Sequence, residues 1–220
     1  MLYFRGGTIR RHEIIADSDW RDGFLFVGND LTLDFVNTRP VQNGEPMELL
    51  SDFAALVRWF RAAGLLSSQA ATNLQHQSGE SAAAGWTLDA MRQFRERLRK
   101  EILAWEGGAE VHRATVGELN RVMAAHPMLS KLEASGNGLS LESWFEPRQP
   151  DDLFAPLAHS AAKLFATADH KRVRKCGQCV LHFHDTSKKG TRRWCSMQLC
   201  GNRLKVAAYG ARQRRNAHER

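Results

Sequence analysis

Apolar residues in the first 170 positions recur mostly every three or four residues, and this spacing predicts a largely helical body. Ser51 or Asp52 can cap the first long helix, whose apolar stripe ends at Gly64. A second helix is expected over residues 67–77. The first of these helices carries its apolar side chains on one face, which is typical of a helix that packs on a core.

The longest predicted helix follows a loop of small and polar residues at 78–85. Thr87 is the expected cap, and Gly107 with Gly108 ends the helix. A row of basic residues accompanies its apolar stripe: Arg92, Arg95, Arg97, Arg99 and Lys100. Because Glu96 and Lys100 have the spacing of an i,i+4 ion pair, we interpret this row as a salt-bridged face exposed to solvent.

Two more helices complete the predicted body. Thr115 and Glu118 have the spacing of a capping box, and Pro127 closes the helix that follows. A last helix is expected over residues 151–169, with one of the two aspartates at its start as the cap.

Short alternating or apolar runs predict a few strands beside these helices. Residues 24–27 and 31–36 flank the turn-forming residues 28–30, so a hairpin is expected there, with a short helix over 31–36 as the alternative. Residues 139–145 alternate and predict a strand. The fold class expected from these patterns is α+β, a mostly helical body with a small sheet.

Charge divides the chain into two unequal parts near His170. Residues 1–170 carry seventeen Lys or Arg against twenty-two acidic residues, whereas residues 171–220 carry fourteen against two, a formal charge of +12. We therefore expect a domain over 1–170, whose residues 1–22 form a flexible arm, and a basic module over 171–220. Such an excess favours nucleic acid or another polyanion as a partner for the module.

All four cysteines lie in the basic module, as the pairs Cys176-x2-Cys179 and Cys195-x4-Cys200. Two close pairs at this separation can surround one tetrahedral Zn²⁺. Two disulfides are the alternative, but the N-terminus shows no secretory signal, and paired spacings without export favour a metal. About fifty residues rarely build a sufficient core, which makes a stabilising metal physically reasonable.

Four thiolates leave no open position for water, so the predicted zinc is structural. The expected order along the module is a zinc knuckle, a hairpin around residues 187–190, a turn, and a helix that begins after Cys200. This order of elements resembles a treble clef. His182 and His184 are two residues apart, and either one is the alternative to a cysteine as a ligand.

Two further motifs carry a family resemblance. The run RRWCSM at 192–197, followed by CGNR at 200–203, resembles the CGNR-type zinc finger, and the run FHDTS at 183–187 fits the same pattern. LDFVNT at 33–38 resembles the start of the ABATE domain, which is found with such fingers. The family is described as stress-induced bacterial transcription regulators, so the resemblance implies a regulator.

The resemblance also implies roles for particular residues. Cys176, Cys179, Cys195 and Cys200 would be the zinc ligands. Arg203 would either brace the module, by binding carbonyls or Asp185, or contact phosphate or guanine.

The basic residues of the module are the candidate DNA contacts. They cluster around the turn near 188–193 and on one face of the expected C-terminal helix: Lys188, Lys189, Arg192, Arg193, Arg203, Lys205, Arg212 and Arg215. Double-stranded DNA is the expected nucleic acid.

The body carries no strong catalytic motif, and an enzyme is not expected. Its densest polar cluster comprises Asp34, Asn37, Thr38 and Arg39, which either line a ligand pocket or close a turn. We expect a DNA-binding regulator whose body senses a small-molecule effector or forms a homodimer. The alternative is an RNA- or protein-binding adaptor with a purely structural zinc module. With no run of eighteen apolar residues, no membrane contact is expected, and the expected location is the cytoplasm.

Overall fold

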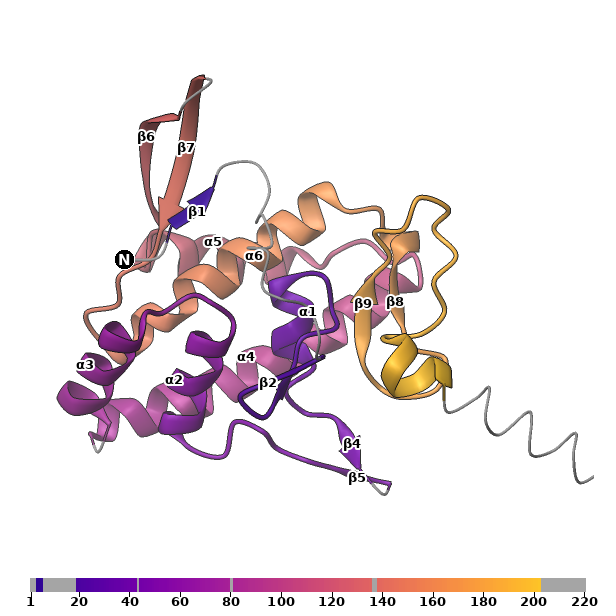
Figure 1. The fold of residues 1–220 in the computed structure, drawn as a ribbon, viewed down its shortest axis with the longest axis horizontal. Helices are drawn as coiled ribbons and strands as arrows, with labels where there is room; N and C mark the ends of the chain where they lie inside the picture. Colours follow the sequence, from indigo (N-terminus) through magenta and orange to yellow (C-terminus); the bar gives the residue numbers. More distant parts are fainter. Residues whose placement is uncertain (1–2, 6–18, 43, 80, 136–137, 203–220) are drawn as a thin grey trace, which may run out of the picture.

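The computed structural model describes residues 3–5, 19–42, 44–79, 81–135 and 138–202, and its body is built of helices packed around one long central helix, α4 (Figure 1). The α-helices are α1 (Leu31–Val36), α2 (Phe53–Ala62), α3 (Ser68–Ser78), α4 (Ala82–Glu106), α5 (Arg113–Ala125) and α6 (Phe154–Thr167). Single helical turns are η1 (Pro150–Leu153), η2 (His170–Arg172) and η3 (Met197–Gly201). Within the described residues, no helix is both long and apolar enough to cross a membrane.

The strands form small antiparallel units. One sheet has the order β1-β7-β6, from β1 (Tyr3–Arg5), β7 (Gly138–Trp144) and β6 (Leu129–Ser135), and Figure 1 shows its β6–β7 hairpin standing away from the helices. Three two-stranded units are β2 (Trp20–Arg21) with β3 (Phe24–Leu25), β4 (Val41–Gln42) with β5 (Glu45–Pro46), and β8 (Val173–Lys175) with β9 (His182–His184). The α+β class with a mostly helical body is confirmed.

The core of the body forms where α4 meets α1 and α2, and aromatic pairs join α4 to α6. Met91, Phe94, Leu98 and Ile102 recur at helical spacing on the buried face of α4. Trp59 of α2 is fully buried and contacts three phenylalanine rings. This packing holds α1 in the interior of the body.

Capping residues explain where the first helices begin and end. Asp52 caps α2 by accepting a hydrogen bond from the N–H of Ala55, and Gly64 follows its end with a φ of 77°. Ser67 caps α3. The helices predicted after Asp52 and over 67–77 are therefore confirmed.

The loop predicted at 78–85 is shorter than expected, because Ser81 rather than Thr87 caps α4. The side chain of Ser81 accepts a hydrogen bond from the N–H of Ala84. Thr87 lies inside the helix, buried, and its hydroxyl donates to Asp151. The alanines at 82–84 extend the helix toward the N-terminus because alanine has the highest helix propensity.

The hairpin predicted over 24–36 is wrong, and the alternative of a short helix over 31–36 is correct. Asp30 caps α1 by accepting from the N–H of Thr32 at 2.8 Å, and the left-handed Asn29 (φ 60°) precedes it. Leu33, Phe35 and Val36 are all fully buried, which no half-buried strand would give. A six-residue apolar run does not distinguish the two structures by its period.

The capping box predicted at Thr115 is also wrong. α5 begins at Arg113, and the hydroxyl of Thr115 donates to Glu101 of α4 at 2.7 Å. Glu118 accepts hydrogen bonds from Arg97 instead of the backbone. Both residues join α5 to α4 rather than capping it.

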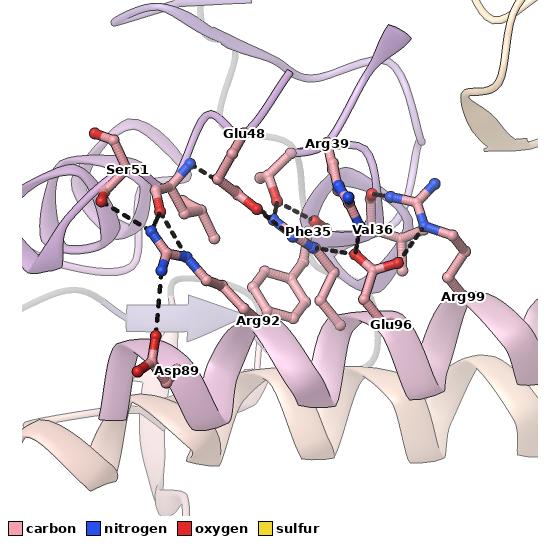
Figure 2. A network of polar contacts seen from close by, with 12 residues as sticks. Phe35, Val36, Arg39, Glu48, Ser51, Asp89, Arg92, Glu96 and Arg99 are labelled. Carbon is pink, nitrogen blue, oxygen red and sulfur yellow. Dashed lines mark hydrogen bonds and ion pairs between the residues drawn. The ribbon is translucent and has the colours of Figure 1, made fainter. Parts of the chain in front are cut away.

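The basic row on α4 points partly inward, contrary to the predicted solvent face (Figure 2). Arg92 donates to the carbonyls of Leu50 and Ser51, and Arg99 donates to that of Val36. Glu96 forms ion pairs with Arg39, Arg95 and Arg99. These bonds fasten the segment between α1 and α2 to the central helix.

Arg95 is the most buried member of this row, with 1% of its surface exposed. It forms a two-pronged ion pair with Glu48 and donates to the hydroxyl of Thr38 at 3.0 Å. Burial opposes ionisation of Glu48, but the hydrogen bonds and charge of Arg95 hold the pKa of its carboxyl below the ordinary value. The pair therefore stabilises the fold at neutral pH, and this contribution is lost as the pH falls through the lowered pKa of Glu48.

We predict that Arg95→Met lowers the free energy of unfolding by about 3 kcal/mol, because it leaves the partly buried carboxylate of Glu48 without its partner. Arg97→Met is the matched control on the same helix. It removes an exposed ion pair with Glu118 and should cost about 1 kcal/mol or less. Urea unfolding of the zinc-loaded protein measures both, and equal losses would contradict the assigned role of Arg95.

Candidate metal centre and nucleic-acid interface

The four cysteines converge on one point, although they come from two separate turns. Cys176 follows β8 and Cys179 precedes β9, so the first pair lies at the tip of the β8–β9 hairpin. Cys195 precedes η3 and Cys200 lies within it. The two paired strands therefore flank the first knuckle. Residues 187–190, for which a hairpin is predicted, form a loop after β9 instead.

The spacing of the sulfur atoms fits a tetrahedral zinc site. The Sγ atom of Cys195 lies 3.6 Å from those of both Cys179 and Cys200, and all four sulfurs lie within 4.8 Å of one another. Zinc–sulfur bonds of about 2.3 Å in a regular tetrahedron place sulfurs about 3.8 Å apart. Cys179 is half-buried and the other three are buried, which suits a structural ion.

The four thiol groups lie so close together that their pKa values differ from one another. The hydrogen bond from the thiol of Cys195 lowers the pKa of Cys179 to about 5. That same bond, together with burial, raises the pKa of Cys195, and burial raises the pKa of Cys200 to about 12. A divalent cation that binds all four as thiolates removes this conflict, because its charge offsets their mutual repulsion.

Backbone contacts hold the two knuckles together. The N–H of Gly177 donates to the carbonyl of Arg193 at 3.2 Å, and a Cβ atom at Gly177 would lie 3.1 Å from the ring of Trp194. A Cβ atom at Gly201 would lie 2.6 Å from the sulfur of Met197. Each glycine thus lies in close contact with a neighbouring side chain. The N–H of Gly201 donates to the carbonyl of Ser196.

His182 and His184, the alternative ligands, lie outside the cluster of four sulfurs among the residues described. His182 is buried, and its Nδ1 lies 3.6 Å from a carboxylate oxygen of Glu106. Its backbone joins the module to the body. This position gives His182 a role in docking rather than in metal binding.

The zinc module docks on the body through hydrogen bonds of two asparagines. The buried amide of Asn37 donates to the carbonyl of His182 and accepts from its N–H, both at 2.8 Å. Asn29 donates to the carbonyl of His184, whose N–H donates to the carbonyl of Gly28 at 2.7 Å. Strand β9 thereby lies against α1 and the turn that precedes it (Figure 1).

Apolar side chains cross the same boundary. Val173 of β8 is buried in the core of the body, while Leu25 and Val27 pack with the cysteines, Leu181 and Phe183. The domain limits of 1–170 and 171–220 stay a prediction, and these contacts show that apolar side chains of the two parts pack together across this boundary.

The four candidate ligand-binding residues use their polar atoms within the fold. Asp34 accepts from the N–H of Gly28 at 2.7 Å, and Asn37 bonds to β9. Thr38 is buried and donates to the carbonyl of Phe35, while Arg39 pairs with Glu96 on the surface. These bonds favour the alternative interpretation, in which the cluster closes a turn, over a ligand pocket.

Two arginines brace the loop at 185–192 from its inner side. Arg172 donates to the carbonyls of Asp185 and Ser187, and Arg174 to those of Gly190 and Arg192, at 2.9–3.2 Å. Asp185 is fully buried. Burial opposes its ionisation, but hydrogen bonds from Ser187 and Arg192 and the charge of Arg174 hold its pKa below the ordinary value.

Arg192, a candidate DNA contact, points into the protein instead. Its guanidinium donates to the carbonyls of Trp194, Cys195 and Val27 and lies 4.5 Å over the ring of Phe183. These contacts connect the second knuckle to the body, so we remove Arg192 from the set of DNA contacts. No signal in the sequence distinguishes it from Arg193, which is exposed.

The remaining candidates divide into two groups. Lys188 and Lys189 are exposed on the braced loop, and Arg193 is exposed one residue past it. The other four lie outside the described residues: Arg203, Lys205, Arg212 and Arg215. Of the helix expected after Cys200, only Gly201 and Asn202 lie within the described residues.

Comparison with family models identifies both parts of the chain. Residues 29–168 match the ABATE family, described as "Putative stress-induced transcription regulator", and residues 172–213 match the CGNR zinc finger. The first match covers more than half of the chain, so the protein belongs to the ABATE family. With the four-cysteine cluster, the second match supports one structural zinc ion. No curated protein matches the chain.

We predict about one zinc ion per chain and its loss in Cys200→Ser, since three thiolates bind zinc far more weakly than four. Elemental analysis of the purified proteins measures this. His184→Gln is the control, which should keep its zinc because His184 lies outside the cluster. A stably folded, metal-free wild-type protein would exclude the site.

We also predict that Asn37→Asp lowers the free energy of unfolding by at least about 1–3 kcal/mol, because a buried carboxylate oxygen would then face the carbonyl of His182. Asn73→Asp on α3 is the control. It changes the same atoms at an exposed position and should alter stability by less than about 0.5 kcal/mol. Chemical unfolding with zinc present tests both, and similar stabilities would refute the role of Asn37.

Proposed function

We propose that this ABATE-family protein is a DNA-binding transcription regulator whose zinc module contacts double-stranded DNA. The family description supplies the class of protein, a stress-induced transcription regulator. The module supplies the charge, with fourteen Lys or Arg against two acidic residues over 171–220. Phosphate contacts by such a module provide affinity that does not depend on sequence.

The observation that carries the proposal is the rigid presentation of the loop at 185–192. Arg172 and Arg174 fix its carbonyls from the inner side, so its outer side projects Lys188 and Lys189 into solvent. Arg193 is exposed one residue past the loop, with its guanidinium 5.5 Å from the ring of Trp194. A preorganised basic loop loses little conformational entropy when it binds a phosphate backbone.

We propose binding rather than catalysis for the zinc centre. Four thiolates complete the tetrahedral coordination of zinc and leave no position for a reactive water. For the body, we propose that it senses a small molecule or forms a homodimer. The intramolecular bonds of Asp34, Asn37 and Thr38 favour the second of these roles.

We predict that the double variant Lys188→Glu/Lys189→Glu binds duplex DNA at least about tenfold more weakly at 0.15 M salt. The dependence of log affinity on log salt should flatten by about two, because two phosphate contacts are lost. Fluorescence anisotropy over a salt series measures both quantities.

The control is Lys100→Glu/Lys163→Glu, which makes the same change in net charge on exposed residues of the body. It should bind like the wild type apart from a small, salt-screened loss. If the loop variant binds duplex DNA as tightly as this control does, the loop does not contact DNA.

Sequencing of genomic fragments retained by the wild-type protein separates a sequence-specific regulator from a general polyanion contact. Retention of RNA or a protein but no DNA would favour the adaptor.

A further inference from the structure

The β6–β7 hairpin exposes more apolar surface than any other strand pair in the described part of the chain. Leu132 is 62% exposed, Leu139 71% and Leu141 53%. In the register of the hairpin, Leu132 lies opposite Leu141, and Ala134 lies opposite Leu139. Residues directly opposite each other share a face, so these side chains form one apolar strip, the leucine face.

Strand β6 also lies at the edge of its sheet. The sheet order is β1-β7-β6, so β7 has neighbours on both sides and β6 has one, among the strands described. An edge strand presents backbone N–H and C=O groups that can pair with another chain. Figure 1 shows the hairpin projecting from the body, well apart from the zinc module, which leaves this edge accessible.

The charges on β6 are self-complementary. Lys131 and Glu133 flank Leu132 and share the face opposite to the leucine face. If two copies of β6 pair antiparallel about Leu132, Lys131 of each copy lies opposite Glu133 of the other. Charged residues whose only role is to prevent pairing at a sheet edge do not need opposite signs at positions 131 and 133. Like charges at both positions would prevent pairing between two copies of β6 more effectively.

We infer that β6 is a homodimer interface, in which two copies pair antiparallel about a two-fold axis at Leu132. This arrangement joins the two three-stranded sheets into one continuous sheet and brings the two leucine faces together around Leu132. Two Lys131–Glu133 pairs form across the axis on the other face, because a two-fold interface repeats every contact. The inference deepens the proposed role of the body in dimerisation, and it does not require that the zinc module binds DNA.

The test is a charge exchange on the zinc-loaded full chain, measured without DNA by sedimentation velocity over a concentration series. Glu133→Lys places lysines opposite one another across the axis, and Lys131→Glu places glutamates opposite one another. Each variant alone should dimerise at least about tenfold more weakly than the wild type. An equimolar mixture of the two variants should recover dimers, because each Lys then meets a Glu of the other chain.

The mixture is decisive because each variant has lost the ion pair that Lys131 and Glu133 form within one chain. Recovery on mixing can come only from contacts between chains.

Leu132→Lys, at the axis, should also abolish dimers, whereas Leu103→Lys, at an exposed leucine of α4, should not. A monomeric wild-type protein, or a mixture that behaves as its two components do separately, would overturn the proposal. These readouts are unchanged if the DNA-binding proposal fails.

Discussion

The hydrogen bonds between Asn37 and the backbone of His182 are the constraint on which the arrangement of the molecule depends. A single buried amide satisfies both polar groups of a strand residue, which would otherwise lie unpaired at the boundary between the body and the zinc module. A side chain that is only a donor or only an acceptor cannot do this. The zinc knuckles are therefore held at a defined position on the body rather than on a free linker.

Asn37 can hold this position only because α1 is itself fixed. Arg99 binds the carbonyl of Val36, and Arg95 binds Thr38, so both neighbours of Asn37 are tied to α4. Glu48 in turn orients Arg95. A path of direct contacts thus runs from the central helix through α1 to β9 and the cysteine cluster. A displacement of α4 relative to α1 would change the surface on which the zinc module docks.

The sequence predicted the features that depend on local chemistry. The spacing of the cysteines indicated one zinc site, and Asp52, Ser67 and Gly108 marked helix ends, because thiolate geometry and capping act over a few residues. It failed where tertiary contacts decide. The run at 31–36 is a helix because α1 is buried on most sides, and Thr115 faces Glu101 of another helix instead of its own N-terminus.

The same distinction governs the interpretation of the charge. A formal charge of +12 counts every basic residue of the module alike, but Arg172, Arg174 and Arg192 donate to backbone carbonyls and shape the fold. Guanidinium groups suit this task because their planar array of donors can satisfy several carbonyls at once, whereas a lysine offers one compact charge. In the described part of the module, the loop at 185–192 follows this division: arginines brace its inner side and lysines occupy its outer side. Within the described part of the module, the charge available to a polyanion is therefore smaller than the composition suggests, and Lys188 and Lys189 lie on a loop whose carbonyls are held by Arg172 and Arg174.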